Sequence, residues 1–70
     1  MGKVSSLQVA EAQRLLKERM VVKQSYNEIG LIQDLKALGI SDGAAGRAMA
    51  LLIGNGEVQR LHGRVVQRMK

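Results

Sequence analysis

The sequence lacks the residues on which disulfide-rich domains and most metal sites depend. It has no cysteine and one histidine, His62, so a disulfide framework and a thiolate zinc site are excluded, and we expect no metal and no cofactor. Proline, phenylalanine and tryptophan are also absent, which leaves Tyr26 as the only aromatic residue. The 70 residues predict a single domain, residues 1–70, whose aliphatic core would stabilise it by only about 3–5 kcal/mol.

Long apolar runs and catalytic motifs are missing as well. The longest apolar run is far shorter than the roughly 20 residues that cross a bilayer, and no signal-peptide segment follows Met1. We therefore expect a soluble intracellular protein without a membrane partner. No Ser-His-acid triad can be proposed, and the glycines fit neither a P-loop nor a dinucleotide-binding motif. The sequence thus predicts neither an enzyme nor a small-molecule substrate.

A capping box and an apolar stripe predict the first helix. Ser5 and Gln8 have capping-box spacing. Apolar residues follow at helical spacing: Val9, Ala12, Leu16 and Met20. These signals place a helix at Ser6 to Arg19, after a frayed start from Met1 to Val4.

A short strand and a second helix are predicted next. Val21–Lys23 is short and rich in β-branched residues, which suits a strand that pairs with a later hairpin. Ser25 and Glu28 form a second capping box, which would open a helix from Tyr26 to about Leu38, ended by Gly39. The buried face of this helix would hold Ile29, Ile32, Leu35 and Leu38.

The stretch from Leu38 to Val66 predicts a turn, a helix and a hairpin. A helix of eleven or twelve residues would present one apolar face made of Ala45, Ala48, Met49, Leu52 and Ile53. Gly54-Asn55-Gly56 would end it, because glycine and asparagine enter the left-handed conformation cheaply. Paired strands would follow at Glu57 to Leu61 and at Arg64 to Met69, joined at His62-Gly63.

This order of elements is typical of a winged helix-turn-helix domain. The residues that carry the resemblance to the general pattern are Gly39-Ile40-Ser41, Arg47, Met49, Leu52, Gly56 and Val58. They correspond to the turn before a recognition helix, to that helix, and to the first strand of the wing. We therefore predict a mainly α fold with a small β-hairpin, arranged as helix-strand-helix-helix-wing.

The positive charge of the chain is concentrated in its second half. The net charge is +5. From Met1 to Asp42, six Lys and Arg against five Asp and Glu give +1; from Gly43 to Lys70, five against one give +4. The excess thus lies on the third helix and the hairpin, where it favours binding to the phosphates of a nucleic acid. The alternative is a solvated face that only keeps the protein soluble.

The candidate contacts lie on the same elements. The set is Ser41, Gly43, Ala44, Arg47, Arg60, His62, Arg64, Arg68 and Lys70. Arg47 should point away from the core, and the small residues around it would let the backbone N–H groups at the helix start approach a phosphate. A protein that recognises DNA bases would instead carry several Asn, Gln, Ser or Arg side chains on this helix. For each arginine the alternative is a solvated side chain, and we predict His62 as a turn residue or phosphate donor.

A narrower resemblance covers most of the chain. Leu15-Leu16-Lys17-Glu18 is similar to a segment in the first helix of the archaeal and eukaryotic small-subunit ribosomal protein twenty-five family, also winged helices. Three further features resemble that family. The third helix has small residues around an arginine, in Gly43–Met49, and the interval from Ile40 to Gly56 is the same. The end of the chain resembles the family at His62, Val65-Val66 and Arg68. Four departures separate the chain from it: no lysine-rich N-terminal tail, a longer second helix, a shorter wing, and an arginine shifted by one residue.

The resemblance implies a structural protein on ribosomal RNA, in the head of the small subunit, in the cytoplasm and beside other ribosomal proteins. It implies RNA contacts by Arg47, Arg60, Arg64 and Arg68, which suits recognition of RNA shape and backbone. One alternative is a small, nucleoid-associated regulator that binds duplex DNA. We expect such a regulator to dimerise, because one helix so poor in polar groups could hardly discriminate a site. The other alternative is a protein-interaction domain.

Overall fold

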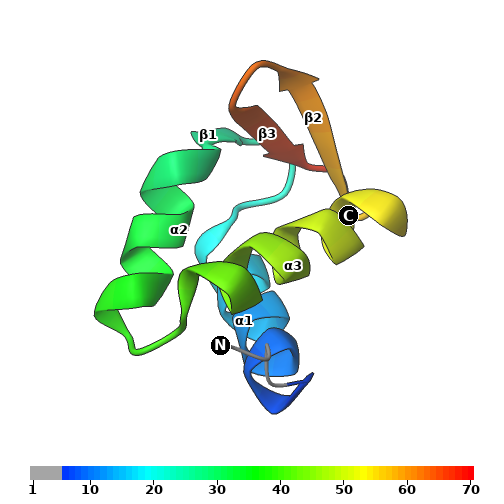
Figure 1. Cartoon of the computed structure of the whole chain (residues 1–70). Coiled ribbons are helices and arrows are strands. Elements are labelled where there is room, and N and C mark those ends of the chain that lie inside the picture. The colour runs from blue at the N-terminus through cyan, green and yellow to red at the C-terminus, as the bar shows by residue number, and fades with distance from the viewer. Residues whose placement is uncertain (1–5) are drawn as a thin grey trace.

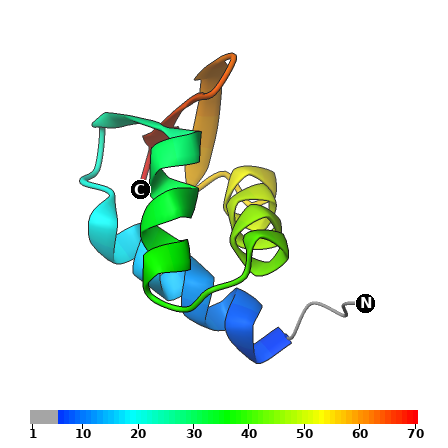
Figure 2. The same cartoon turned by 60° about the vertical axis from the view of Figure 1, so that its left-hand side comes forward.

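Three helices pack beneath a small antiparallel sheet in the computed structural model, which describes residues 6–70 (Figures 1 and 2). The elements in chain order are α1 (Ser6–Arg19), β1 (Ser25–Asn27), α2 (Glu28–Ala37), α3 (Asp42–Gly54), β2 (Val58–His62) and β3 (Val65–Arg68). The prediction of a mainly helical fold with a small β element is confirmed. Within the described residues, no helix is long and apolar enough to span a membrane.

The sheet has the strand order β1-β3-β2, with β3 in the centre and antiparallel to both neighbours. Each bound of the two hairpin strands differs from the prediction by one residue. Strand β2 starts and ends one residue later and so includes His62, and β3 is one residue shorter at each end. The chain reverses at Gly63-Arg64, where Gly63 has a φ of +52°. A bulge lies between Arg60 and His62, so the register of the pairing shifts there, and His62 pairs with Val65.

The prediction of the first strand at Val21–Lys23 is wrong, since β1 lies at Ser25–Asn27. Lys23 has a φ of +71°, and this left-handed residue interrupts the extended run that the β-branched residues begin. Val22 contributes only an isolated parallel bridge to Arg68. The Lys23 N–H also donates to the Arg68 carbonyl at 2.6 Å, so the turn remains attached to β3.

Helix α2 begins two residues later than predicted. Asn27, and not Ser25, is its N-cap, because the Asn27 Oδ1 accepts from the N–H groups of Ile29 and Gly30 at 2.9 and 3.3 Å. Asparagine is as good an N-cap as serine, and Ser25 is occupied in β1. The predicted capping box of Ser25 and Glu28 is therefore wrong.

The predicted buried face of α2 is only partly correct. Leu35 is buried and Ile32 packs against the core, as predicted. Leu31, which was not predicted, is also buried, whereas the first and last residues of the predicted face are not. Ile29 is 42% exposed and Leu38 is 53% exposed. The helix has apolar residues on more than one face, so spacing alone allows two stripes, and packing in the folded chain buries the one that contains Leu31 and Leu35. As predicted, Gly39 ends the helix, with a φ of +92°.

The core lies between α1, α3 and the inner face of the sheet. All four residues of the predicted stripe of α1 are buried: Val9, Ala12, Leu16 and Met20. In α3, the predicted stripe is buried except for the half-buried Ile53, and Ala44 is buried as well. Alanines on both helices allow α1 and α3 to pack closely. Ser5, the predicted cap of α1, lies outside the described residues.

Gly30 lies in the first turn of α2, and open space surrounds the position where a side chain would begin. A Cβ built there would meet no described atom within 4 Å, so close packing does not explain the glycine. We expect Gly30→Ala to raise the free energy of unfolding by about 0.5–1 kcal/mol, because alanine loses less backbone entropy than glycine in a helix. Urea unfolding followed by circular dichroism measures this change, and a destabilised variant would contradict the prediction.

Candidate nucleic-acid interface

The start of α3 is already capped from within the chain. The Ser41 hydroxyl accepts from the Ala44 N–H at 3.2 Å, and the Ser41 N–H donates to the side chain of Gln8 at 3.3 Å. Ala44 is fully buried. Since neither the side chain nor the N–H of Ala44 is available at the surface, we leave Ala44 out of the candidate interface.

The outward face of α3 carries Arg47 and the exposed Leu51 among small residues. Arg47 is exposed, as predicted, and Gly43, Ala50 and Gly54 are exposed on the same face, with Gly46 half-buried beside it. This face therefore offers no side-chain amide or hydroxyl that could pair with a base edge. Its chemistry is limited to the Arg47 guanidinium, the apolar side chain of Leu51 and the backbone that the small residues leave accessible.

Arg47 and the hairpin lie on different flanks of α3. Arg47 borders a groove of about 490 Å³ that is lined by Val9 and Ala10 of α1. Ile53, which projects roughly 120° away around the helix, borders a second groove with Arg60 and Lys70. The structure thus separates Arg47 from the hairpin cations with which the sequence grouped it.

Arg60 is held by α2. Its guanidinium donates to both carboxylate oxygens of Glu28, at 2.6 and 3.2 Å, and to the Gly63 carbonyl at 3.1 Å. The hydrogen bond from Arg60 to Glu28 and the charge of that carboxylate raise the pKa of Arg60 above its ordinary value. Because its charge is matched by Glu28, Arg60 contributes more to holding the hairpin on α2 than to an outward positive surface.

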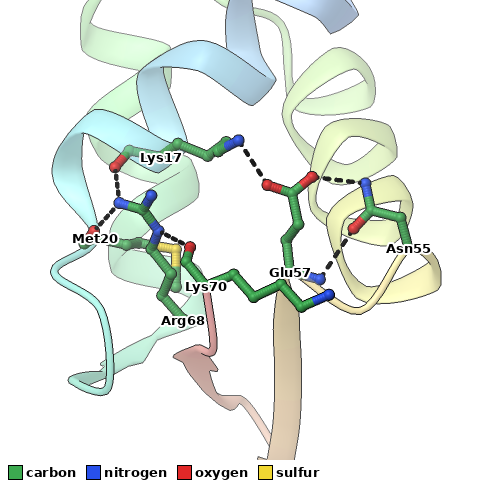
Figure 3. Close-up of polar contacts among 6 residues, drawn as sticks. All are labelled: Lys17, Met20, Asn55, Glu57, Arg68 and Lys70. Atoms are coloured by element: carbon green, nitrogen blue, oxygen red, sulfur yellow. Dashed lines mark hydrogen bonds and ion pairs between the residues drawn. The ribbon is translucent and has the colours of Figure 1, made fainter.

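Arg68 is held by the end of α1 (Figure 3). One guanidinium nitrogen donates to the carbonyls of Lys17 at 2.7 Å and of Met20 at 2.8 Å, and Nε donates to the Lys70 carbonyl at 2.6 Å. The last carbonyls of a helix have no partner within the helix and carry partial negative charge. Arg68 therefore acts as a cap that ties β3 to α1.

A second set of contacts joins the same parts of the fold (Figure 3). Lys17 on α1 forms an ion pair with Glu57 at 2.6 Å. Asn55, at the end of α3, donates to the Glu57 carboxylate at 2.9 Å and accepts from the Glu57 N–H at 3.0 Å. These contacts link α1 to the turn between α3 and β2, next to the Arg68 cap.

Acid should weaken this link. The hydrogen bond from Lys17, together with the charge of Lys17 and the Asn55 contact, lowers the pKa of Glu57 below its ordinary value of 4.5. A carboxylate with a lowered folded-state pKa adds stability that is complete above the unfolded-state value and is lost as the pH falls through the folded-state value. We expect the unfolding free energy to fall below about pH 4.5, and to fall less steeply in Glu57→Gln. Parallel pH profiles of the two proteins in urea unfolding would contradict this.

Every acidic side chain of the protein forms an ion pair with a lysine or arginine. The six carboxylates are Glu11, Glu18, Glu28, Asp34, Asp42 and Glu57, and each pairs with a lysine or arginine. Of the described cations, five have no acidic partner: Lys23, Arg47, Arg64, Arg68 and Lys70. Arg68 is bound to carbonyls, which leaves four side chains whose charge faces solvent unmatched.

Arg64 is the unmatched arginine at the tip of the hairpin. Its carbonyl accepts from the Glu28 N–H at 2.7 Å, which fixes the tip over the start of α2, while its side chain is exposed. His62 is exposed beside it. Among residues 6–70, no three His, Asp or Glu side chains gather where they could hold a metal ion. The tip is therefore a rigid position from which one guanidinium extends.

The internal roles of Arg60 and Arg68 were not predicted from the sequence, although the strand alternation carries a signal for them. Side chains two residues apart in a strand point to the same face. Arg60 follows Val58 and Arg68 follows Val66 at this spacing, and both valines are buried. The alternation alone thus directs these two arginines toward the helices.

Comparisons with known proteins assign no family. The chain matches no protein-family profile, no curated protein and no solved structure. Its candidate interface is therefore defined by its own geometry: the Arg47 face of α3 and the Arg64 tip of the hairpin.

Proposed function

We propose that this protein is a winged helix that binds the phosphate backbone of structured RNA without catalysing a reaction. In this proposal α2 and α3 are the helix-turn-helix, the β2-β3 hairpin is a short wing, and the sheet order β1-β3-β2 follows from the first strand joining the wing. The observation that carries the proposal is that Arg47 and Arg64 have no acidic partner among residues 6–70, although all six carboxylates are paired.

The outward face of α3 favours backbone recognition over reading of bases. Bidentate contacts to base edges need several Arg, Asn or Gln side chains on one face, whereas this face has Arg47 and Leu51 among glycines and Ala50. RNA duplexes are recognised mainly through their shape, phosphates and 2′-hydroxyls, which a smooth helix with one guanidinium can contact. Ribosomal RNA of the small subunit is the partner that we favour, and duplex DNA is the alternative.

Salt dependence of binding tests this proposal. We expect wild-type protein to bind a ribosomal RNA hairpin at low salt, more tightly than random duplex DNA of equal length. Arg47→Ala and Arg64→Ala should each reduce the slope of log K against log salt concentration by about 0.7–0.9, because each removes roughly one phosphate contact. If both arginines contact the same RNA molecule, the double variant should lose the sum of the two slopes.

Arg14→Ala is the matched control. It lowers the net charge by the same amount, but the Arg14 guanidinium is bound to Glu11 and Glu18, so the slope should remain unchanged. If Arg14→Ala lowered the slope as much as Arg47→Ala, the loss would reflect net charge alone and not a contact made by Arg47. Tighter binding to duplex DNA by a dimer would favour a DNA-binding regulator instead, and absence of binding at low salt would contradict both.

A further inference from the structure

The open edge of β2 is not used by the proposed RNA surface. The sheet order leaves one side of β2 without a neighbouring strand in the described part of the chain (Figure 1). On the other side, the Met69 N–H donates to the Glu57 carbonyl at 2.8 Å. Because backbone bonds alternate along an antiparallel strand, Glu57 and Gln59 face β3, while Val58 and Arg60 direct their N–H and C=O groups to the open edge.

A groove with apolar walls and positive charge borders β2. Its volume is about 710 Å³, and its apolar lining comes from Ile53, Val58 and Met69. Two cations, Arg60 and Lys70, also line it, and no acidic residue does. Lys70 has no acidic partner within residues 6–70, so its charge remains available to a ligand.

The charge of the groove selects among the possible occupants. A second copy of this chain is disfavoured, because each copy carries a net charge of +5 and antiparallel pairing of two β2 strands would bring like charges together. A strand with carboxylates would instead complement Lys70. Unpaired backbone groups and apolar walls favour a peptide strand, whose main chain can bond to the edge while alternate side chains enter the groove.

We propose that β2 binds an extended acidic peptide segment of another protein, which adds to the sheet as a fourth strand. Its backbone pairs with Val58 and Arg60, an apolar side chain enters the groove against Met69, and a carboxylate meets Lys70. The bulge after Arg60 limits the contact to a short segment, which makes the interaction weak and reversible. This proposal does not rest on RNA binding.

Two synthetic hexapeptides test it, one alternating glutamate with valine (EVEVEV) and one alternating lysine with valine (KVKVKV). The full chain, labelled with ¹⁵N, is titrated with each peptide and followed by NMR. We expect EVEVEV to bind at least about tenfold more tightly than KVKVKV. It should shift the amide signals of Val58 and Arg60 and slow their hydrogen exchange, because both N–H groups become bonded.

Substitutions in the groove give the specific readout. Met69→Glu and Lys70→Glu should each weaken EVEVEV binding about tenfold. Leu51→Glu is the control, since Leu51 is similarly exposed but borders the groove between α1 and α3, and binding should be unchanged. Equal binding of the two peptides, or shifts away from β2, would overturn the proposal. Displacement of the peptide by structured RNA would assign the groove to nucleic acid and would overturn it as well.

Discussion

Replacing Arg68 with methionine should lower the free energy of unfolding by about 2–3 kcal/mol, because hydrogen bonds from a charged donor to half-buried carbonyls are among the stronger polar contacts. Methionine keeps the aliphatic part of the side chain but leaves the carbonyls of Lys17, Met20 and Lys70 without their guanidinium donor. In a domain of this size, with a stability of about 3–5 kcal/mol, the loss is about half or more of the total. Urea unfolding followed by circular dichroism measures it.

Two variants show whether geometry or charge is responsible. Arg68→Lys keeps the charge but cannot span several carbonyls from one planar group, so it should be nearly as unstable as Arg68→Met. Arg64→Ala removes an exposed arginine of the same hairpin and should change stability by less than about 0.5 kcal/mol. Full stability of Arg68→Lys would show that only the charge matters, and would contradict the capping role.

Leu16→Ala should have an effect of similar size, about 3 kcal/mol of destabilisation. Leu16 is fully buried on α1, within the cluster that joins α1 to α3 and to the sheet. Truncation removes apolar contacts and leaves a cavity that the closely packed alanines cannot fill. At 37 °C a large fraction of the variant should be unfolded, which the same denaturation measurement and the loss of NMR dispersion would show.

Leu7→Ala is the control for this variant. Leu7 lies on the same helix but is 83% exposed, so its removal should change stability by less than about 0.5 kcal/mol. If the two variants were equally stable, the core described for α1 would be contradicted.

The helices were predictable from local pattern because helical signals lie within a few residues of each other. The end of α1 and the buried stripes of α1 and α3 agree with the apolar spacing. The ends of α2 and α3 agree with the glycines that follow them in left-handed conformations. The start of α2 was not predictable in this way. Ser25 and Asn27 both offer caps, and pairing of Ser25 with Gln67 in the sheet decides between them.

The first strand shows a similar limit. β-branching favours Val21-Val22, but a strand also requires a partner with matching register. The partner, β3, pairs with Ser25–Asn27, where Asn27 meets Val65. That register pairs residues that lie more than 35 positions apart in the sequence, so a local sequence pattern does not predict it.

The roles of the arginines were the least predictable part of the candidate site. Strand alternation directs Arg60 and Arg68 inward, yet only the folded chain places Glu28 and the end of α1 at the right distance to receive them. Arg47 and Arg64 remain outside these contacts. The number of positive charges in the second half of the sequence therefore overstates the charge that is available to a ligand.

We propose a division of roles among these four arginines: Arg60 and Arg68 hold the fold, and Arg47 and Arg64 face a nucleic acid. Its most direct test measures both unfolding free energy and the salt slope of RNA binding for single alanine variants at 47, 60, 64 and 68. We predict that Arg47→Ala and Arg64→Ala each lose about 0.7–0.9 of slope at unchanged stability. Arg60→Ala and Arg68→Ala should lose stability and keep the slope while folded. Stable Arg60 or Arg68 variants that lose the slope would contradict this division.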